Sequence, residues 1–189
     1  MILELRKIGV LPRDEDLDYP VDEVRGLFDA HGLDVSFLEA DAAPADLDLV
    51  VALGGDGTVL RAFDRFPGCP VLAINFGTVG FLTAGERKDL AQIVQLLVDG
   101  HYVVSERLVL LCRYPGGEAL VYNEVTLRSR HKLLFTDVFV DDAKIRTIRG
   151  DGVVVGTPTG STGLLMSMGA PLVMPEVRCI MLDGINEYN

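Results

Sequence analysis

A glycine-rich turn around one carboxylate is the part of this 189-residue sequence best suited to chemistry. The apolar run at residues 47–53 leads into Gly54-Gly55-Asp56-Gly57-Thr58, and a helix-like stretch at 59–66 follows. Glycines let backbone amides approach a ligand closely, and a helix N-terminus favours anions such as phosphate. The pattern indicates an acid, Asp56, at the mouth of a phosphate-binding turn, where it is placed to act as a base or a metal ligand.

The turn differs from two commoner phosphate-binding loops. It lacks the GxxxxGK[S/T] pattern, and Leu60 stands where GxGxxG requires its third glycine. The competing interpretation is an ordinary strand-to-helix turn in which Asp56 is the N-cap. A lone GDG favours that interpretation, whereas GGDGT after a buried strand favours a functional site. A second glycine-bearing loop, residues 75–82, is by itself a weak signal.

Two further polar segments lie in the second half of the chain. Asn123 and Glu124 interrupt an apolar stretch, so one of them faces inward or lies at a strand end; together they can bind the adjacent hydroxyls of a sugar. The run from Thr157 to Gly163 is dense in hydroxyls and glycine ahead of a short helix, which suits a nucleobase or phosphate. The alternatives are a satisfied buried polar group for the first segment and a solvated, N-capped loop for the second.

Charge and cysteine content limit the classes of partner. The formal net charge of −11 argues against nucleic acid and anionic membranes as partners, and a phosphate site here needs its own local positive charge. Arg61, Lys132 and Arg149 are candidates, although each alone is more often a surface charge. The three cysteines have no CxxC spacing and no signal peptide or membrane span is evident, so we expect a cytoplasmic protein.

The elements that must position these residues alternate between strand and helix in the first half. Strands are expected at residues 7–11, 33–38, 47–53 and 70–75, with helices at 21–31, 59–66 and 86–98 and polar loops at 12–20 and 39–46. This alternation predicts an α/β domain with a doubly wound parallel sheet, in which ligands bind beyond the carboxyl ends of the strands.

The second half has a different texture and predicts a β-rich domain. Its expected strands lie at 102–112, 119–128, 133–141, 145–148 and 153–156, with hairpin turns at 115–117 and 141–143. We place the boundary near Gly100, which divides the chain into domains 1–100 and 101–189.

The ordered set of motifs resembles the NAD kinase family, which makes NADP by phosphorylating NAD. The resemblance rests on Gly54–Thr58, residues 75–82, Asn123-Glu124, Asp151-Gly152 and Thr157–Thr162, in that order. The GGDGT turn alone is shared with lipid kinases of the diacylglycerol type and, in a related form, with phosphofructokinases, whereas the full set is much more specific.

The resemblance implies a role for each matching residue. Asp56 would take the proton from the 2′-hydroxyl of the adenosine ribose, which then attacks the γ-phosphorus of ATP, with a divalent cation such as Mg²⁺. Polyphosphate is the donor for some members, and the family is commonly a homo-oligomer. Asn123 and Glu124 would hold the ribose. The remaining implied NAD- or phosphate-binding residues are Gly57, Arg61, Lys132, Arg149, Asp151, Thr162, Gly163, Leu164, Leu165, Met166 and Ser167; no metal ligand is assigned.

Two departures from the family pattern keep a second hypothesis open. Leu164 replaces the aromatic residue expected after Gly160-Ser161-Thr162-Gly163, and the β-rich domain looks truncated after residues 177–182. A homologue that binds nucleotides but turns them over poorly is therefore an alternative to an active kinase. A lipid kinase is a third reading, which the lack of a basic or amphipathic membrane-facing segment disfavours.

Overall fold

The computed structural model describes residues 3–13, 20–39, 46–77 and 80–188 and divides into two compact units, Met1–Val104 and Ser105–Asn189. Most of the loops expected at 12–20 and 39–46 lies outside the described residues. Among the described residues, no helix combines the length and the apolar character needed to cross a membrane.

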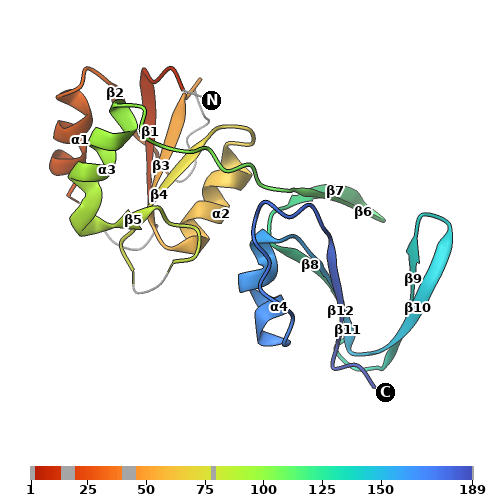
Figure 1. Ribbon diagram of the computed structural model, residues 1–189. Helices are drawn as coiled ribbons and strands as arrows, with labels where there is room; N and C mark the ends of the chain where they lie inside the picture. The colour runs from red at the N-terminus through yellow and green to blue at the C-terminus, as the bar shows by residue number, and fades with distance from the viewer. Residues whose placement is uncertain (1–2, 14–19, 40–45, 78–79, 189) are drawn as a thin grey trace. The chain divides into compact units, whose positions relative to one another are not determined.

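The first unit is a five-stranded parallel sheet in the order β2-β1-β3-β4-β5 (Figure 1). Its strands are β1 (Lys7–Pro12), β2 (Asp34–Phe37), β3 (Leu49–Gly54), β4 (Val71–Asn75) and the short β5 (Gly85–Glu86). Its helices are α1 (Val21–Asp29), α2 (Asp56–Arg65), the 3-10 turn η1 (Arg87–Asp89) and α3 (Leu90–Val98).

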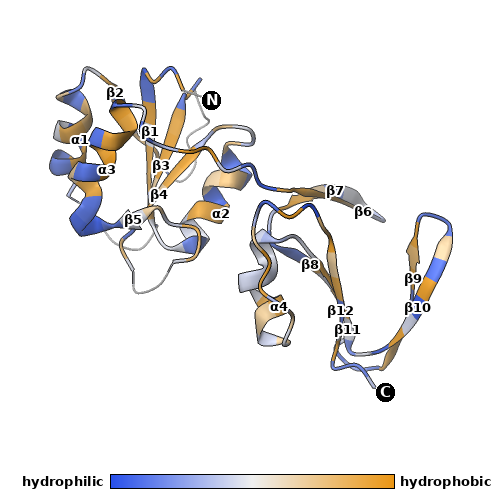
Figure 2. Ribbon diagram, in the orientation of Figure 1, coloured by the Kyte–Doolittle hydropathy of each residue, from blue (hydrophilic) through white to orange (hydrophobic). Residues whose placement is uncertain are grey.

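Helices cover both faces of this sheet because its central strands are apolar on both sides. Every residue of β3 is buried, and Figure 2 shows hydrophobic residues concentrated on β1, β3 and β4. Val51 packs with α1 and α3 on one face, whereas Val50 packs with α2 on the other. The prediction of a doubly wound α/β domain is confirmed.

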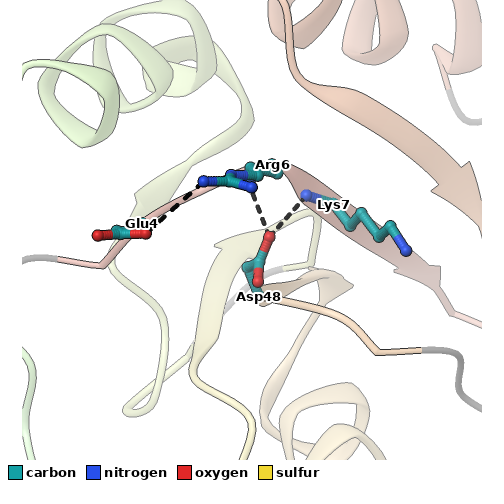
Figure 3. Close-up of polar contacts among 4 residues, drawn as sticks. All are labelled: Glu4, Arg6, Lys7 and Asp48. Atoms are coloured by element: carbon teal, nitrogen blue, oxygen red, sulfur yellow. Dashed lines mark hydrogen bonds and ion pairs between the residues drawn. The ribbon is translucent and has the colours of Figure 1, made fainter.

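A carboxylate joins the entry of β3 to the entry of β1. Asp48 Oδ2 accepts the backbone N–H groups of Arg6 and Lys7 at 2.8 Å each (Figure 3). The Asp48 N–H donates to the Lys7 carbonyl at 3.0 Å. The two N–H bonds lower the pKa of Asp48, with that from Lys7 the larger cause. The contact lies where β1 begins to pair with β3, the strand that leads into the glycine-rich turn.

The second unit is built from antiparallel strands. A three-stranded sheet in the order β12-β11-β8 joins β8 (Glu124–Arg128), β11 (Gly152–Gly156) and β12 (Met181–Ile185). Two hairpins accompany it, β6 (Leu110–Tyr114) with β7 (Gly117–Val121), and β9 (Leu134–Val140) with β10 (Ala143–Gly150). The 3-10 turn η2 (Thr159–Thr162) and the short helix α4 (Leu164–Ser167) connect β11 to β12. The β-rich character is confirmed, and both predicted hairpin turns are present.

Several boundaries differ from the prediction, among them the three that follow. Helix α2 begins at Asp56 rather than residue 59, because Gly55, not Asp56, is the N-cap. Only the end of the strand expected at 102–112 is strand, as β6. The strand expected at 119–128 is split into β7 and β8 at Tyr122 and Asn123, because the carbonyls of both residues accept bonds from Thr157 instead of pairing within a sheet.

Candidate functional site

The glycine-rich turn is formed at the carboxyl end of β3. Gly54 has no room for a side chain, since an added Cβ would overlap Thr58 Oγ1 and lie 2.9 Å from Thr58 Cβ. Thr58 is buried beneath the turn, and its N–H donates to the Gly55 carbonyl at 2.9 Å. The glycine at 54 therefore lets the chain pass directly from the buried strand into α2, which brings Asp56 to the first position of the helix.

The second glycine-bearing loop holds the Asp56 carboxylate. Phe81 N–H donates to Asp56 Oδ1 at 3.0 Å and to Oδ2 at 3.1 Å, and Leu82 N–H donates to Oδ1 at 3.0 Å. The loop follows β4, the sheet neighbour of β3, so both segments leave the same edge of the sheet. Residues 78–79 of this loop lie outside the described residues. A segment with a weak sequence signal thus belongs to the environment of the candidate catalytic residue.

Gly57 and Arg61 occupy different surroundings on α2. Gly57 is exposed, and a Cβ built on it meets no atom within 4 Å. Arg61 is half-buried and donates to the Pro12 carbonyl at 3.0 Å. Burial lowers the pKa of Arg61, and the charge of Arg65 lowers it further. Packing in the described chain does not require a glycine at 57, whereas Arg61 already links α2 to the end of β1.

Asn123 and Glu124 form the polar centre of the second unit. Glu124 is the first residue of β8, in agreement with the expectation that one of the two faces inward or lies at a strand end. Within the described part of the chain, Asn123 Oδ1 and Glu124 Oε2 are buried and have no hydrogen-bond partner. Burial raises the pKa of Glu124, while a bond from the Leu164 N–H opposes the rise. Buried acceptors without partners are costly, and they indicate a place where a ligand supplies donors.

The Thr157–Gly163 loop packs tightly against this pair. Thr157 N–H donates to the Asn123 carbonyl at 2.8 Å, and Thr157 Oγ1 donates to the Tyr122 carbonyl at 2.5 Å. A Cβ on Gly160 would overlap the backbone of Asn123, and one on Gly163 would lie 3.1 Å from Glu124 Oε2. Glycines at these positions thus let the loop run directly over the unpartnered acceptors.

Ser161 fixes the other side of the same loop. Its buried hydroxyl donates to the Val173 carbonyl at 3.3 Å and accepts the Val173 N–H at 3.1 Å. One side chain therefore takes the place of a pair of backbone hydrogen bonds. The sequence motif includes Ser161 but does not predict this contact, because Val173 lies 12 residues away in the chain.

The predicted adenosine-lining segment divides by burial. Thr162, Gly163 and Leu164 are half-buried, whereas Met166 and Ser167 are exposed. The Leu165 side chain is fully buried in a cluster with Val154 and Ile185. Its location makes Leu165 a core residue that anchors α4, so only its backbone is available to line a pocket.

The remaining predicted residues lie elsewhere in the second unit. Asp151 precedes β11, whereas Glu124 pairs in register with Gly156 at the far end of that strand, about 16 Å from Asp151 at the usual rise per residue. Asp151 Oδ2 accepts the Asn186 side-chain amide at 2.7 Å. Arg149 is exposed and stacks over Phe135, and Lys132 is exposed in the turn before β9. Within this unit, these three residues do not join the Asn123–Glu124 cluster.

Both halves of the chain match models of one protein family. Residues 34–102 match the family model of the ATP-NAD kinase N-terminal domain, and residues 122–188 match that of the ATP-NAD kinase C-terminal domain. An NAD kinase of Leifsonia xyli subsp. xyli is 42% identical over 160 residues, which cover 80% of this chain and 53% of that protein. An NAD kinase of Thermoplasma acidophilum is 31% identical over 189 residues, covering 96% of this chain and 65% of that protein.

A solved structure has the same fold. The crystal structure of an NAD kinase from Archaeoglobus fulgidus in complex with ATP has a TM-score of 0.82 and 29% identity, covering 97% of this chain and 73% of that chain. The present chain spans about half the length of several of the curated relatives that it matches.

Proposed function

The chain belongs to the ATP-NAD kinase family, and we propose that it transfers the γ-phosphate of ATP to the 2′-hydroxyl of the adenosine ribose of NAD, giving NADP. The observation that carries the proposal is the pair of buried acceptors, Asn123 Oδ1 and Glu124 Oε2, which have no partner in the described chain. Two unpartnered acceptors on consecutive residues suit the adjacent hydroxyls of a ribose, which donate two hydrogen bonds.

Asp56 is the proposed base for the acceptor hydroxyl. Its Oδ1 accepts two backbone N–H groups and its Oδ2 only a share of one, so Oδ2 keeps more capacity to accept a proton. The proton of the 2′-hydroxyl passes to Asp56 while the oxygen bonds to the γ-phosphorus and ADP leaves. Because a carboxylate is a weak base, positioning supplies much of the rate enhancement.

A divalent cation is proposed to enter with the nucleotide. Among the described residues, no group of three or more His, Cys, Asp or Glu could hold a metal ion. Mg²⁺ in kinases is bound mainly by substrate phosphates, water and one or two carboxylates, so a nucleotide-bound ion does not need such a group of protein ligands. When bound, the cation would neutralise charge that develops on the phosphates. The homo-oligomeric state, the cytoplasmic location and the use of ATP or polyphosphate as the phosphate donor stay predictions.

The test is NADP formation from NAD, ATP and Mg²⁺ by the purified chain and by Asp56→Asn. We expect Asp56→Asn to lower kcat by about 10²–10⁴, the usual contribution of a positioned acid or base. Asp64→Asn is the matched control, because Asp64 is an exposed carboxylate on the same helix. Undiminished turnover in Asp56→Asn would remove Asp56 from the reaction.

A second measurement separates an active kinase from a homologue that only binds nucleotides. Half-buried Leu164, where the family has an aromatic residue, is the feature that favours the weaker homologue. Calorimetry should detect NAD binding that Glu124→Ala weakens. Binding without NADP formation would support the nucleotide-binding homologue, and turnover would exclude it.

A further inference from the structure

The Asp56 carboxylate is held by main-chain groups from a distant part of the sequence. The donors, Phe81 N–H and Leu82 N–H, lie 25 and 26 residues after Asp56. The three N···O distances are 3.0–3.1 Å, which is normal for hydrogen bonds to a carboxylate. The Asp56 carboxylate is thus held by a second loop as well as by its own helix.

The contacts distinguish the two oxygens of Asp56. Oδ1 accepts both amides, whereas Oδ2 accepts only the bifurcated bond from Phe81. A carboxylate has about four acceptor positions, so most of the remaining capacity is on Oδ2. The loop therefore sets which oxygen is available to a substrate hydroxyl and limits rotation of the carboxylate.

The loop that carries these amides is itself tied to the sheet. Asn75 Oδ1 accepts the Gly77 N–H at 2.8 Å, and the Phe76 N–H donates to the Gly54 carbonyl at 3.3 Å. At its other end, the Ala84 N–H donates to the Ala73 carbonyl at 2.8 Å. Because the loop is attached to the sheet at both ends, its amides can orient the Asp56 side chain with little loss of entropy during the reaction.

Phe81 contributes through its backbone rather than its side chain. The side chain is 54% exposed, whereas its N–H contacts both oxygens of Asp56. Removing the ring therefore leaves the contact in place, and removing the N–H breaks it. This separation allows the contact to be tested without changing Asp56.

We propose that the backbone amides of Phe81 and Leu82 are positioning groups for phosphoryl transfer, holding Asp56 so that Oδ2 faces the acceptor hydroxyl. The proposal rests on the proposed function. It adds a role for the loop after β4, whose amides act through Asp56 and need not touch substrate.

The decisive variant replaces the Phe81 amide by an ester, by incorporation of phenyllactic acid at position 81, with Phe81→Ala as the control that keeps the N–H. We expect the ester to lower kcat for NADP formation about 10- to 100-fold, as for loss of a hydrogen bond to a charged group, while KM for NAD changes less than threefold. Phe81→Ala, which keeps the N–H, should lower kcat less than the ester does. An ester at Leu82 provides a second variant if the first does not fold.

Amide hydrogen exchange tests the contact without any activity. The Phe81 and Leu82 amides should exchange slowly in the parent chain and at least tenfold faster in Asp56→Ala, with Asp64→Ala unchanged. Unprotected amides in the parent chain would overturn the inference. An active chain whose ester variants keep full kcat would overturn the positioning role alone, whereas a chain that forms no NADP would overturn the proposed function and the positioning role with it.

Discussion

Glu124 is a residue whose surroundings suit a ligand better than they suit folding. Its Oε2 atom is buried without a partner in the described chain, and burial raises the pKa of the carboxyl. An ionised carboxylate in this position lowers the stability of the folded chain. A buried group that costs stability, on the residue next to a second unpartnered acceptor, Asn123 Oδ1, is typical of a binding site.

We predict that Glu124→Gln raises the free energy of unfolding at pH 7, because the amide keeps the shape and removes the buried charge. The folded chain binds the Glu124 proton more tightly than the unfolded chain, so wild-type stability falls as pH rises from the ordinary carboxyl pKa through the raised value. The advantage of Glu124→Gln should be full above that window and absent below it.

Urea unfolding at several pH values measures this difference, with Glu176→Gln as the control at an exposed carboxylate of the same unit. The same Glu124→Gln variant should bind NAD about tenfold more weakly, since a charged acceptor is lost. A Glu124→Gln chain that is less stable than the parent at pH 7 contradicts the assignment of Glu124 as a destabilising binding residue.

Gly54 and Gly57, at the turn between β3 and α2, have different structural roles. Gly54 is required by packing, because an added Cβ would meet the buried Thr58 side chain. Gly57 is in open space on the first turn of α2. A glycine that the packing of the described chain does not require is a candidate for close approach of a ligand to the backbone.

We predict that Gly54→Ala destabilises the chain by about 1–3 kcal/mol, the usual cost of overpacking. Gly57→Ala should stabilise it by up to about 1 kcal/mol, since alanine is the better helix former, yet it should reduce NADP formation by crowding the substrate. Urea unfolding and kinetics on both variants measure the two effects. Equal stability of the two variants, or full activity in Gly57→Ala, would go against this division of roles.

The whole molecule consists of two units with separate cores. Each of the four clusters of buried hydrophobic residues found in the described part of the chain draws on one unit only. The first unit packs α1 and α3 on one face of its parallel sheet and α2 on the other. A sheet covered on both faces is a complete core by itself.

We predict that residues 1–104 fold without the second unit. The isolated segment should show mixed helix and strand content by circular dichroism and a single cooperative thermal transition. A Val51→Asp variant, which places a charge in the buried β3 strand, should abolish that transition and provides the control. A segment with no cooperative transition would show that its core depends on residues 105–189.

Several features of this protein follow from the sequence by itself. The apolar run before Gly54 indicates a buried parallel strand, and the β3-turn-α2 connection follows from glycine and helix patterns that act over a few neighbours. The order of motifs likewise indicates the ATP-NAD kinase family, which the comparisons confirm. Local patterns determine these features because burial and turn geometry are properties of short segments.

Other features were decided only by the tertiary structure. The bonds from Phe81 and Leu82 to Asp56 depend on β3 and β4 being sheet neighbours, and the burial of Leu165 depends on α4 packing against β11 and β12. The register of β8 on β11 separates Asp151 from Glu124, although both belong to the same motif set. Strand order and register join residues far apart in the chain, and no short segment contains the interactions that set them.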